Sequence, residues 1–331
     1  MGQFLVAVAD SVFPTLDPAR AVLSKIGAEL SLAEKPTPDA IVKVARGADA
    51  VLVTYAKITA DMIWQMAQCR IIARFGIGVD NVDIAAATDA GIVVTRVPDY
   101  CIDEVSDHTL ALLLALVRKI PFANSSVQAG RWEMSATVPI HRLRGRILGL
   151  VGFGRIPQLL APKAKAFGLE VVTYDPFVPA DITASAGVES VDFATLLKVS
   201  DYVSIHTPLM PDTQDLFNAD VFRQMKPTAY LINTARGPIV DEAALACALD
   251  AGQLTGAALD VLSQEPPTGS PLLGRDNVIL TPHMSFYSVE SLVELQTKAA
   301  EEVVRVLTGQ MPRNPVNPKV TASRTERRPT V

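Results

Sequence analysis

The sequence is poor in cysteine and contains no long apolar run, and both shortages limit what the protein can be. Its three cysteines stand far apart at positions 69, 101 and 247, without a C-x-x-C pair. We therefore expect neither a disulfide framework nor a metal site, and a reducing compartment is favoured. The longest apolar run, residues 110–117, is too short to cross a bilayer. Because the N-terminus also lacks the features of a signal peptide, we expect a cytoplasmic protein without a membrane partner.

An excess of positive charge is missing as well. The chain has 30 lysines and arginines against 35 aspartates and glutamates, which gives a formal net charge of −5. A nucleic-acid partner is therefore not expected. The composition is that of a globular protein, with 49% apolar and 20% charged residues, and the length of 331 residues suggests two domains.

Strand and helix patterns alternate through the first hundred residues. Short apolar runs such as 4–9, 50–54 and 71–73 are separated by segments in which apolar residues recur at helical spacing. This alternation predicts a small doubly wound parallel sheet, and it contains no phosphate-binding fingerprint. After the third of these runs, Gly76 and Gly78 expose backbone N–H groups that could hold a carboxylate. A plain strand-to-helix turn is the alternative interpretation.

Residues 146–175 predict a strand, a glycine turn, a helix and a second parallel strand. The apolar run 147–151 leads into Gly152 and Gly154, and a second apolar run ends at Asp175. Glycines allow a tight turn, and the following helix N-terminus favours a pyrophosphate. The N–H groups expected to hold it are those of Gly154, Arg155 and Ile156. Asp175 would bind the adenosine ribose and repel a 2′-phosphate, so we predict NAD rather than NADP as the cofactor.

Two prolines depart from this fingerprint. Pro157 stands where a third glycine is usual, although proline suits the first turn of a helix. Pro162 falls in the helix interior, where proline removes a backbone hydrogen bond and is expected to bend the axis. Taken alone, the stretch could also be an ordinary strand-turn-helix. We predict that NAD binds nevertheless, because the phosphate-binding N–H groups precede Pro157.

Polar residues follow the later strand patterns at 202–205, 230–232 and 257–259. The carboxyl ends of parallel strands share one edge of a sheet, and that edge faces a bound dinucleotide. A long helix at 102–118 is the natural connector between the two series of strands. His108 lies within it and is interpreted as a structural residue.

The domain boundaries follow from this order. We expect one domain at 1–99 together with 286–331, since an amphipathic helix at about 289–307 would return to the first series. The second domain would comprise residues 100–285. The tail is rich in proline and charge, so we expect it to be disordered past about residue 320.

Five stretches together resemble the D-isomer-specific 2-hydroxyacid dehydrogenases. They are R-F-G-I-G-V-D-N-V-D at 74–83, the glycine turn with Y-D-P at 174–176, N-T-A-R-G-P-I-V-D at 233–241, A-A-L-D-V at 257–261 with Glu265, and T-P-H at 281–283. Within the family, A-K-A-F-G, Y-D-P and H-x-x-F-Y-S are most similar to the C-terminal-binding-protein branch, followed by phosphoglycerate dehydrogenase-like members. The resemblance implies an α/β fold of two doubly wound parallel-sheet domains. One would be a flavodoxin-like substrate domain and the other a Rossmann dinucleotide-binding domain.

The resemblance also implies a catalytic trio of Arg236, Glu265 and His283. The planar guanidinium of Arg236 could hold the carboxylate of a 2-oxo acid and polarise its carbonyl oxygen. Hydride transfer to the carbonyl carbon belongs to the nicotinamide. His283 would protonate the oxygen as general acid, and Glu265 would fix the orientation of its ring. Each residue alone could be a structural or solvated side chain, and the ordered combination favours the catalytic interpretation.

Further site residues are carried over from the family. Those expected to line the cofactor, besides the glycine turn and the trio, are Cys101, Thr207, Thr234, Ala235 and Asp260. The residues expected to hold the substrate carboxylate are Gly76, Ile77 and Gly78. Tyr55, Phe286 and Tyr287 could wall the substrate side chain. Since no obvious basic cluster lies near the strand ends, we expect apolar or aromatic 2-oxo acids to be preferred over phosphorylated ones.

The implied function is NAD-dependent reduction of a small 2-oxo acid to the D-2-hydroxy acid. The alternative is an NAD-sensing, corepressor-like scaffold with little catalysis, because the most similar branch includes corepressors. A relative that oxidises formate or phosphite is a third possibility. The family further suggests a homodimer joined through the nucleotide domain, with the helix at 102–118 as its seat.

Overall fold

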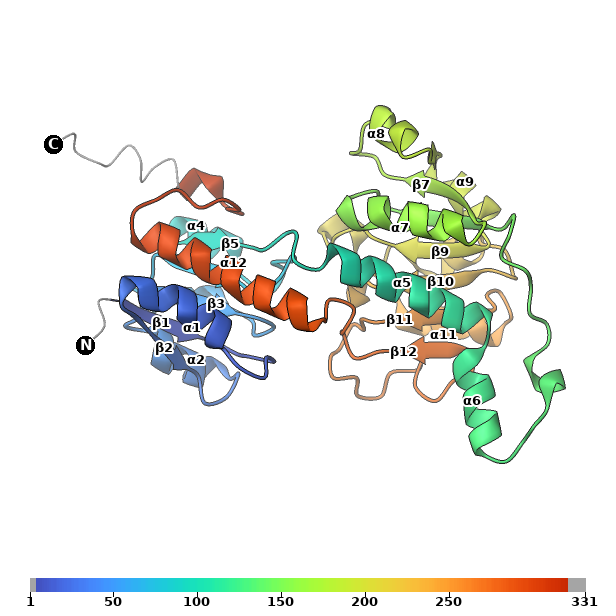
Figure 1. Cartoon of the computed structure of the whole chain (residues 1–331), viewed down its shortest axis with the longest axis horizontal. Helices are drawn as coiled ribbons and strands as arrows, with labels where there is room; N and C mark the ends of the chain where they lie inside the picture. Colours follow the sequence, from blue (N-terminus) through green and yellow to red (C-terminus); the bar gives the residue numbers. More distant parts are fainter. Residues whose placement is uncertain (1–3, 321–331) are drawn as a thin grey trace. The chain divides into compact units, whose positions relative to one another are not determined.

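The computed structural model describes residues 4–320. The disorder expected past residue 320 therefore lies outside the described residues. The chain divides into two compact units, each built around its own parallel sheet (Figure 1). Unit 1 comprises residues 1–100 with 288–331, and unit 2 comprises residues 101–287.

Unit 1 is an α/β unit with a five-stranded sheet. Its strands are β1 (Phe4–Val8), β2 (Ala28–Leu32), β3 (Ala50–Val53), β4 (Ile71–Arg74) and β5 (Val93–Thr95). Its helices are α1 (Asp17–Leu23), η1 (Ser24–Ile26), α2 (Pro38–Ala45), α3 (Ala60–Ile63), α4 (Ile84–Asp89) and α12 (Val289–Leu307). Each of the five α-helices buries part of its residues, whereas η1 buries none.

The five strands of unit 1 are parallel in the order β2-β1-β3-β4-β5. Helices cover both faces, which explains why β3 and β4 are buried along their whole length. Ile41 and Ile63, from α2 and α3, pack with one set of alternating strand residues that includes Val51. Helices α1 and α12 contact each other, and α12 lies on β4. The strand order is the flavodoxin-like one, as predicted.

Unit 2 contains a seven-stranded parallel sheet. Its strands are β6 (Ile147–Val151), β7 (Glu170–Tyr174), β8 (Glu189–Ser190), β9 (Tyr202–Ile205), β10 (Tyr230–Asn233), β11 (Gly256–Leu259) and β12 (Val278–Leu280). Its α-helices are α5 (Ile102–Val117), α6 (Ile120–Gln128), α7 (Arg155–Ala166), α8 (Ala180–Ser185), α9 (Phe193–Val199), α10 (Ala219–Phe222) and α11 (Glu242–Asp250). Short 3₁₀ helices are η2 (Met134–Thr137), η3 (Pro211–Thr213) and η4 (Gly237–Ile239).

The strand order of unit 2 is β12-β11-β10-β9-β6-β7-β8. The chain therefore runs outward from β6 in one direction through β7 and β8, and in the other direction from β9. The point where the order reverses, between β6 and β9, is where open α/β sheets bind ligands at the carboxyl ends of the strands. Helices α5 and α7 share one core cluster with the sheet, and α9, α10 and α11 share the other. The prediction of a second, Rossmann-like doubly wound unit is confirmed.

The sequence pattern does not predict the short strands β8 and β12, because β8 has only two residues and β12 has only three, none of them fully buried. Pro162 lies in the interior of α7, where the sequence places it, and the helix continues past it to Ala166.

No single helix among residues 4–320 has the length and apolar composition needed to cross a membrane. Helices α5 and α6 reach these limits only as a pair bent by 59°. Half of the residues of α5 are buried within the protein.

Candidate active site

The glycine turn after β6 requires one of its two glycines for steric reasons. Gly152 has a φ of +98°, and a Cβ there would lie 2.9 Å from the backbone carbonyl of His206. A side chain at position 152 is therefore excluded for two reasons. The positive φ disfavours it, and it would clash with the backbone that follows β9. Gly154 is different, because a Cβ at that position would meet nothing within 4 Å.

Asp175 braces this turn from the end of β7. Its Oδ2 accepts the N–H of Phe153 at 2.8 Å, and its Oδ1 accepts the N–H groups of Phe177 and Val178 at 2.9 and 3.2 Å. The side chain is half-buried, and a carboxylate retains lone pairs for further donors. Asp175 therefore stands at the sheet edge where a ribose hydroxyl can be bound.

The residues present fit the phosphates of a dinucleotide. Gly154 is the N-cap of α7, a helix of 12 residues whose first N–H groups point out of the helix. The space beside Gly154 is open, and Arg155 is exposed at the first helical position. Pro157 lies at the third helical position and is buried, where its missing N–H removes no helical hydrogen bond.

Arg236 is held in a turn directly after β10. The fully buried Asn233 accepts the N–H of Ala235 at 2.9 Å and donates to the carbonyl of Arg236 at 2.9 Å. The guanidinium of Arg236 donates to the carbonyl of Ala235 at 2.8 Å, and the residue is half-buried. Asn233 thus fixes the backbone from which this cation projects.

Asp260, directly after β11, fixes the segment that carries His283. The residue is 1% exposed, and its carboxylate accepts hydrogen bonds from the Thr281 hydroxyl and from the N–H groups of Met284 and Ser285. The carbonyl of Asp260 accepts the N–H of His283 at 2.8 Å. His283 has a φ of 51°, an uncommon conformation for a side-chain-bearing residue that needs this support.

His283 and Glu265 form a short hydrogen bond. His283 Nδ1 lies 2.7 Å from Glu265 Oε2, and Glu265 Oε1 accepts the N–H of Leu262 at 3.0 Å. Burial favours the neutral acid and opposes a low pKa of Glu265. The hydrogen bond and charge of His283, the Leu262 N–H and the charge of Arg236 outweigh burial and lower that pKa. Glu265 is therefore ionised and holds the ring through Nδ1.

Unit 2 holds the predicted trio together. His283 is hydrogen-bonded to Glu265, and the charge of Arg236 is near enough to lower the pKa of Glu265. The ring of Phe286 stands edge-on to His283, with 6.3 Å between ring centroids. Tyr287, the next residue, is 50% exposed.

The exposed fraction differs among three other residues that are predicted to line the cofactor. Thr207 is half-buried. Thr234 is buried, and its hydroxyl lies 2.9 Å from that of Thr109 on α5. Cys101, the N-cap of α5, is 2% exposed.

Two other histidines belong to this edge of the sheet. His206 has its Nε2 2.9 Å from the Ser204 hydroxyl, and burial lowers its pKa to about 3. It stays neutral and cannot act as a cationic acid. His108 has its Nε2 3.2 Å from the Thr281 hydroxyl. No group of three or more potential metal-ligating side chains occurs within residues 4–320.

In unit 1 the predicted carboxylate-binding loop follows β4. Gly76 has a φ of +151°, and its N–H donates to the carbonyl of Arg74 at 2.9 Å. Of the three predicted N–H donors, this one is therefore engaged within its own turn. Ile77 and Gly78 follow and are half-buried.

Arg74 is a candidate that the sequence reasoning missed. The residue is 8% exposed, and its Nη1 lies 1.0 Å from where a Cβ on Gly76 would be. Its guanidinium carbon lies 6.0 Å from the ring centroid of Tyr55. A buried cation beside a glycine loop at the carboxyl edge of a sheet is a candidate anion site. The signal for it in the sequence is the arginine that opens the R-F-G-I-G stretch.

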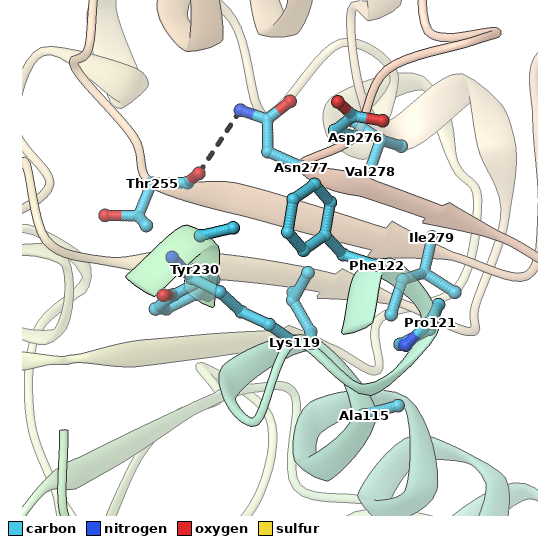
Figure 2. Close-up of a pocket in the computed structure, with 12 residues that line it drawn as sticks. Ala115, Lys119, Pro121, Phe122, Tyr230, Thr255, Asp276, Asn277, Val278 and Ile279 are labelled. Atoms are coloured by element: carbon cyan, nitrogen blue, oxygen red, sulfur yellow. Dashed lines mark hydrogen bonds between the residues drawn. The ribbon is translucent and has the colours of Figure 1, made fainter. Parts of the chain in front are cut away.

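A separate cavity of about 200 Å³ lies at the opposite edge of the seven-stranded sheet (Figure 2). It is lined by Tyr230 and Val278, which begin β10 and β12, and by Phe122 of α6. Arg236 and Asp260 follow the carboxyl ends of their strands. The cavity is therefore not part of the candidate active site.

Comparison with known proteins places these observations in a family. Residues 110–285 match the family model described as D-isomer specific 2-hydroxyacid dehydrogenase, NAD binding domain. The D-3-phosphoglycerate dehydrogenase of Methanocaldococcus jannaschii is 38% identical over 306 residues, which are 92% of this chain and 58% of that protein. The chain thus spans little more than half the length of this curated relative.

Two solved structures extend the comparison over nearly the whole chain. The TT0316 protein from Thermus thermophilus is 35% identical with a TM-score of 0.86, covering 94% of this chain and 99% of that one. The D-lactate dehydrogenase from Aquifex aeolicus, solved with NAD and lactic acid, is 27% identical with a TM-score of 0.85. That match covers 95% of this chain and 99% of the other.

Proposed function

Because the chain belongs to the D-isomer-specific 2-hydroxyacid dehydrogenase family, we propose that it reduces a small 2-oxo acid to the D-2-hydroxy acid with NADH. The observation that carries this proposal is the 2.7 Å hydrogen bond between His283 Nδ1 and Glu265, with Arg236 close enough to lower the pKa of Glu265. This is the arrangement needed to hold a carboxylate and deliver a proton.

In the proposed mechanism Arg236 binds the substrate carboxylate and polarises the carbonyl oxygen with its fixed donors. The bound nicotinamide supplies the hydride. His283 delivers its proton from Nε2 to the oxygen as negative charge develops there, because Nδ1 is held by Glu265. The ionised Glu265 fixes the ring orientation and balances the imidazolium charge.

We assign the cofactor to unit 2. Asp175 supports NAD over NADP, since a half-buried carboxylate that already accepts three N–H groups would repel a 2′-phosphate. The glycine turn would hold the pyrophosphate through Gly154, Arg155 and Ile156. Thr207, Thr234, Ala235, Asp260 and Cys101 remain proposed neighbours of the cofactor.

Two sets of features favour different substrate side chains. Phe286 and Tyr287, which follow His283 in unit 2, favour an apolar or aromatic 2-oxo acid. The similarity to a phosphoglycerate dehydrogenase favours an anionic one, and unit 1 has a buried guanidinium of its own, that of Arg74, to hold an anion. Rates with phenylpyruvate, hydroxypyruvate, pyruvate and 3-phosphohydroxypyruvate decide between them, and superiority of the phosphorylated substrate would end the apolar preference.

A turnover assay tests the function itself. We expect steady NADH oxidation with at least one 2-oxo acid and a marked preference for NADH over NADPH. His283→Ala should lower kcat by about 10²–10⁴-fold, because it removes the general acid, and should retain NADH binding by calorimetry. NADH binding without turnover of any 2-oxo acid would instead support the scaffold alternative, and oxidation of formate or phosphite with NAD would support the third.

We also propose that two copies of the chain associate through unit 2. The apolar face of α5 packs on its own sheet, so the contact would come from α6 and the segment after it. This segment exposes apolar side chains and extends beyond the sheet of unit 2 (Figure 1). They are Ile120, Val127, Trp132, Met134 and Val138. The cavity beside Phe122 (Figure 2) is lined in part by Ala136 of this segment and offers an apolar surface.

A further inference from the structure

The loop that carries Glu265 has no helix or strand between β11 and residue 270, so other contacts must hold it. One of them is a close backbone approach at Gly237. A Cβ on Gly237 would lie 1.9 Å from the carbonyl carbon of Leu262 and 2.4 Å from the nitrogen of Ser263. Gly237 directly follows Arg236, so the two catalytic segments touch through their backbones.

The second contact is made by Glu242, the first residue of α11. Its Oε1 accepts the N–H of Ser263 at 2.7 Å, and its Oε2 accepts the hydroxyl of Ser270 at 2.6 Å. Glu242 is not needed to cap its own helix, because the side chain of Asp241 accepts the first free N–H groups of α11. The carboxylate instead spans the loop, with one anchor on each side of Glu265.

The two hydrogen bonds between Glu242 and the loop are expected to be strong. Both hydrogen bonds are short and have an ionised acceptor, which makes them stronger than bonds between neutral groups. The carboxylate is half-buried and stands at a helix N-terminus, where the macrodipole favours its negative charge. Release of the loop would let Glu265 move away from His283, because no helix or strand holds the loop between its two anchors.

We propose that Glu242 is a positioning residue that holds the Glu265 loop and so keeps the Glu265 carboxylate on His283. This inference rests on the proposed function and extends it to a residue that touches neither substrate nor cofactor. Ser270 is the second anchor of the loop on Glu242, and Gly237 allows the loop backbone to approach the turn that carries Arg236.

The test compares Glu242→Ala, Glu242→Gln and Ser270→Ala with the control Glu290→Ala. The control removes an exposed first-turn glutamate from α12. We expect Glu242→Ala to lower kcat about 10-fold, in the range found for residues that orient catalytic ligands, with the NADH dissociation constant within about twofold of wild type. Glu242→Gln should recover much of the activity, because an amide can accept from Ser263 and donate to Ser270. Glu290→Ala should change nothing.

Two readouts separate positioning from a merely structural role. Without its His283 partner, Glu265 should titrate at higher pH, so the acid limb of the kcat/KM profile should move upward in Glu242→Ala. In a Glu265→Ala background, Glu242→Ala should have almost no further effect on kcat, because both act through one group. Additive losses, or an unmoved acid limb despite a lowered kcat, would overturn the proposal.

A cofactor-free measurement keeps this test independent of turnover. The titration of the Glu265 carboxyl, followed by NMR of ¹³C-labelled glutamate, should shift upward in Glu242→Ala and stay unchanged in Glu290→Ala. If the wild type turns over no substrate, the proposed function fails. The positioning role then still stands or falls with this titration.

Discussion

Gly152 and Gly154 belong to one turn, but only Gly152 is required by the fold. Gly152→Ala forces a side chain into a left-handed conformation and against the backbone of His206. We expect it to destabilise the fold by about 1–3 kcal/mol. Gly154→Ala should fold like wild type, because a Cβ there meets open space, and should weaken NADH binding by intruding on the proposed phosphate site. Urea midpoints and calorimetric NADH titrations measure the two effects.

The opposite ranking would contradict this division. A Gly154→Ala protein with a lowered urea midpoint would show that the space beside Gly154 is needed by the fold. Unchanged NADH affinity in the same variant would place the pyrophosphate elsewhere.

Asp201 is a buried carboxylate that ties together the beginnings of strands in unit 2. It is 6% exposed and accepts hydrogen bonds from Arg146, Lys226 and the N–H of Ile147 at 2.9–3.1 Å. Burial acts to raise the pKa of Asp201, but these three donors outweigh it and hold the pKa below its ordinary value of 3.8. A carboxyl with a lowered folded-state pKa stabilises the fold above pH 3.8, and this contribution is lost as pH falls through the folded-state value.

The expected consequence is a pH-dependent effect of Asp201→Asn. At pH 7 the variant should be less stable by about 1–3 kcal/mol, because two cations lose their partner. The difference from wild type should shrink steadily below pH 3.8. Denaturant unfolding at pH 7, 4.5 and 3 checks this, and a difference that stays constant across these values would show that the carboxylate charge is not responsible.

At the scale of elements, α7 offers a matched pair of prolines. Pro162 is exposed, and it lacks the N–H that would donate to the carbonyl of Gln158 in a regular helix. Pro162→Ala should therefore stabilise the protein by about 1–2 kcal/mol, less than the full helix penalty because proline also restricts the unfolded chain. Pro157→Ala should give no gain, since its buried ring is lost and its N–H has no helical acceptor. Thermal unfolding of both variants provides the measurement, and equal shifts would contradict the argument.

The two sheets were predictable from the sequence, but many of the contacts between polar groups were not. Strands such as β9, buried at all four positions, stand out as apolar runs, so the two parallel sheets were predictable. The candidate trio of Arg236, Glu265 and His283 was predictable only as an ordered motif. What could not be predicted is which partner each polar group selects after folding. The carboxylate of Asp260 binds the segment 281–285, more than twenty residues further along the chain. The guanidinium of Arg74 folds back over Gly76, which is a choice of side-chain conformation that the sequence does not show.

At the scale of the whole molecule, the exposed apolar side chains of unit 2 are unevenly distributed. Trp132 and Met134 are 87% and 81% exposed. They stand with the exposed Val138 in the segment after α6, and α6 itself exposes Ile120 and Val127. A cluster of this kind marks an association surface more often than a lone exposed side chain does. Phe177, 81% exposed after the end of β7, is such a lone side chain and provides the control.

We therefore expect the wild type to sediment as a dimer at micromolar concentration and Trp132→Ser with Met134→Ser to shift it to monomer. Phe177→Ser should leave the dimer intact. Two side chains cannot supply the roughly 1,200–2,000 Å² that a stable interface buries, so the cavity beside Phe122 and the exposed face of α6 must take part. A bulky polar substitution at Ala136, which lines that cavity, should then weaken the dimer as well. Dissociation by Phe177→Ser, or a monomeric wild type, would show that the segment after α6 serves another partner.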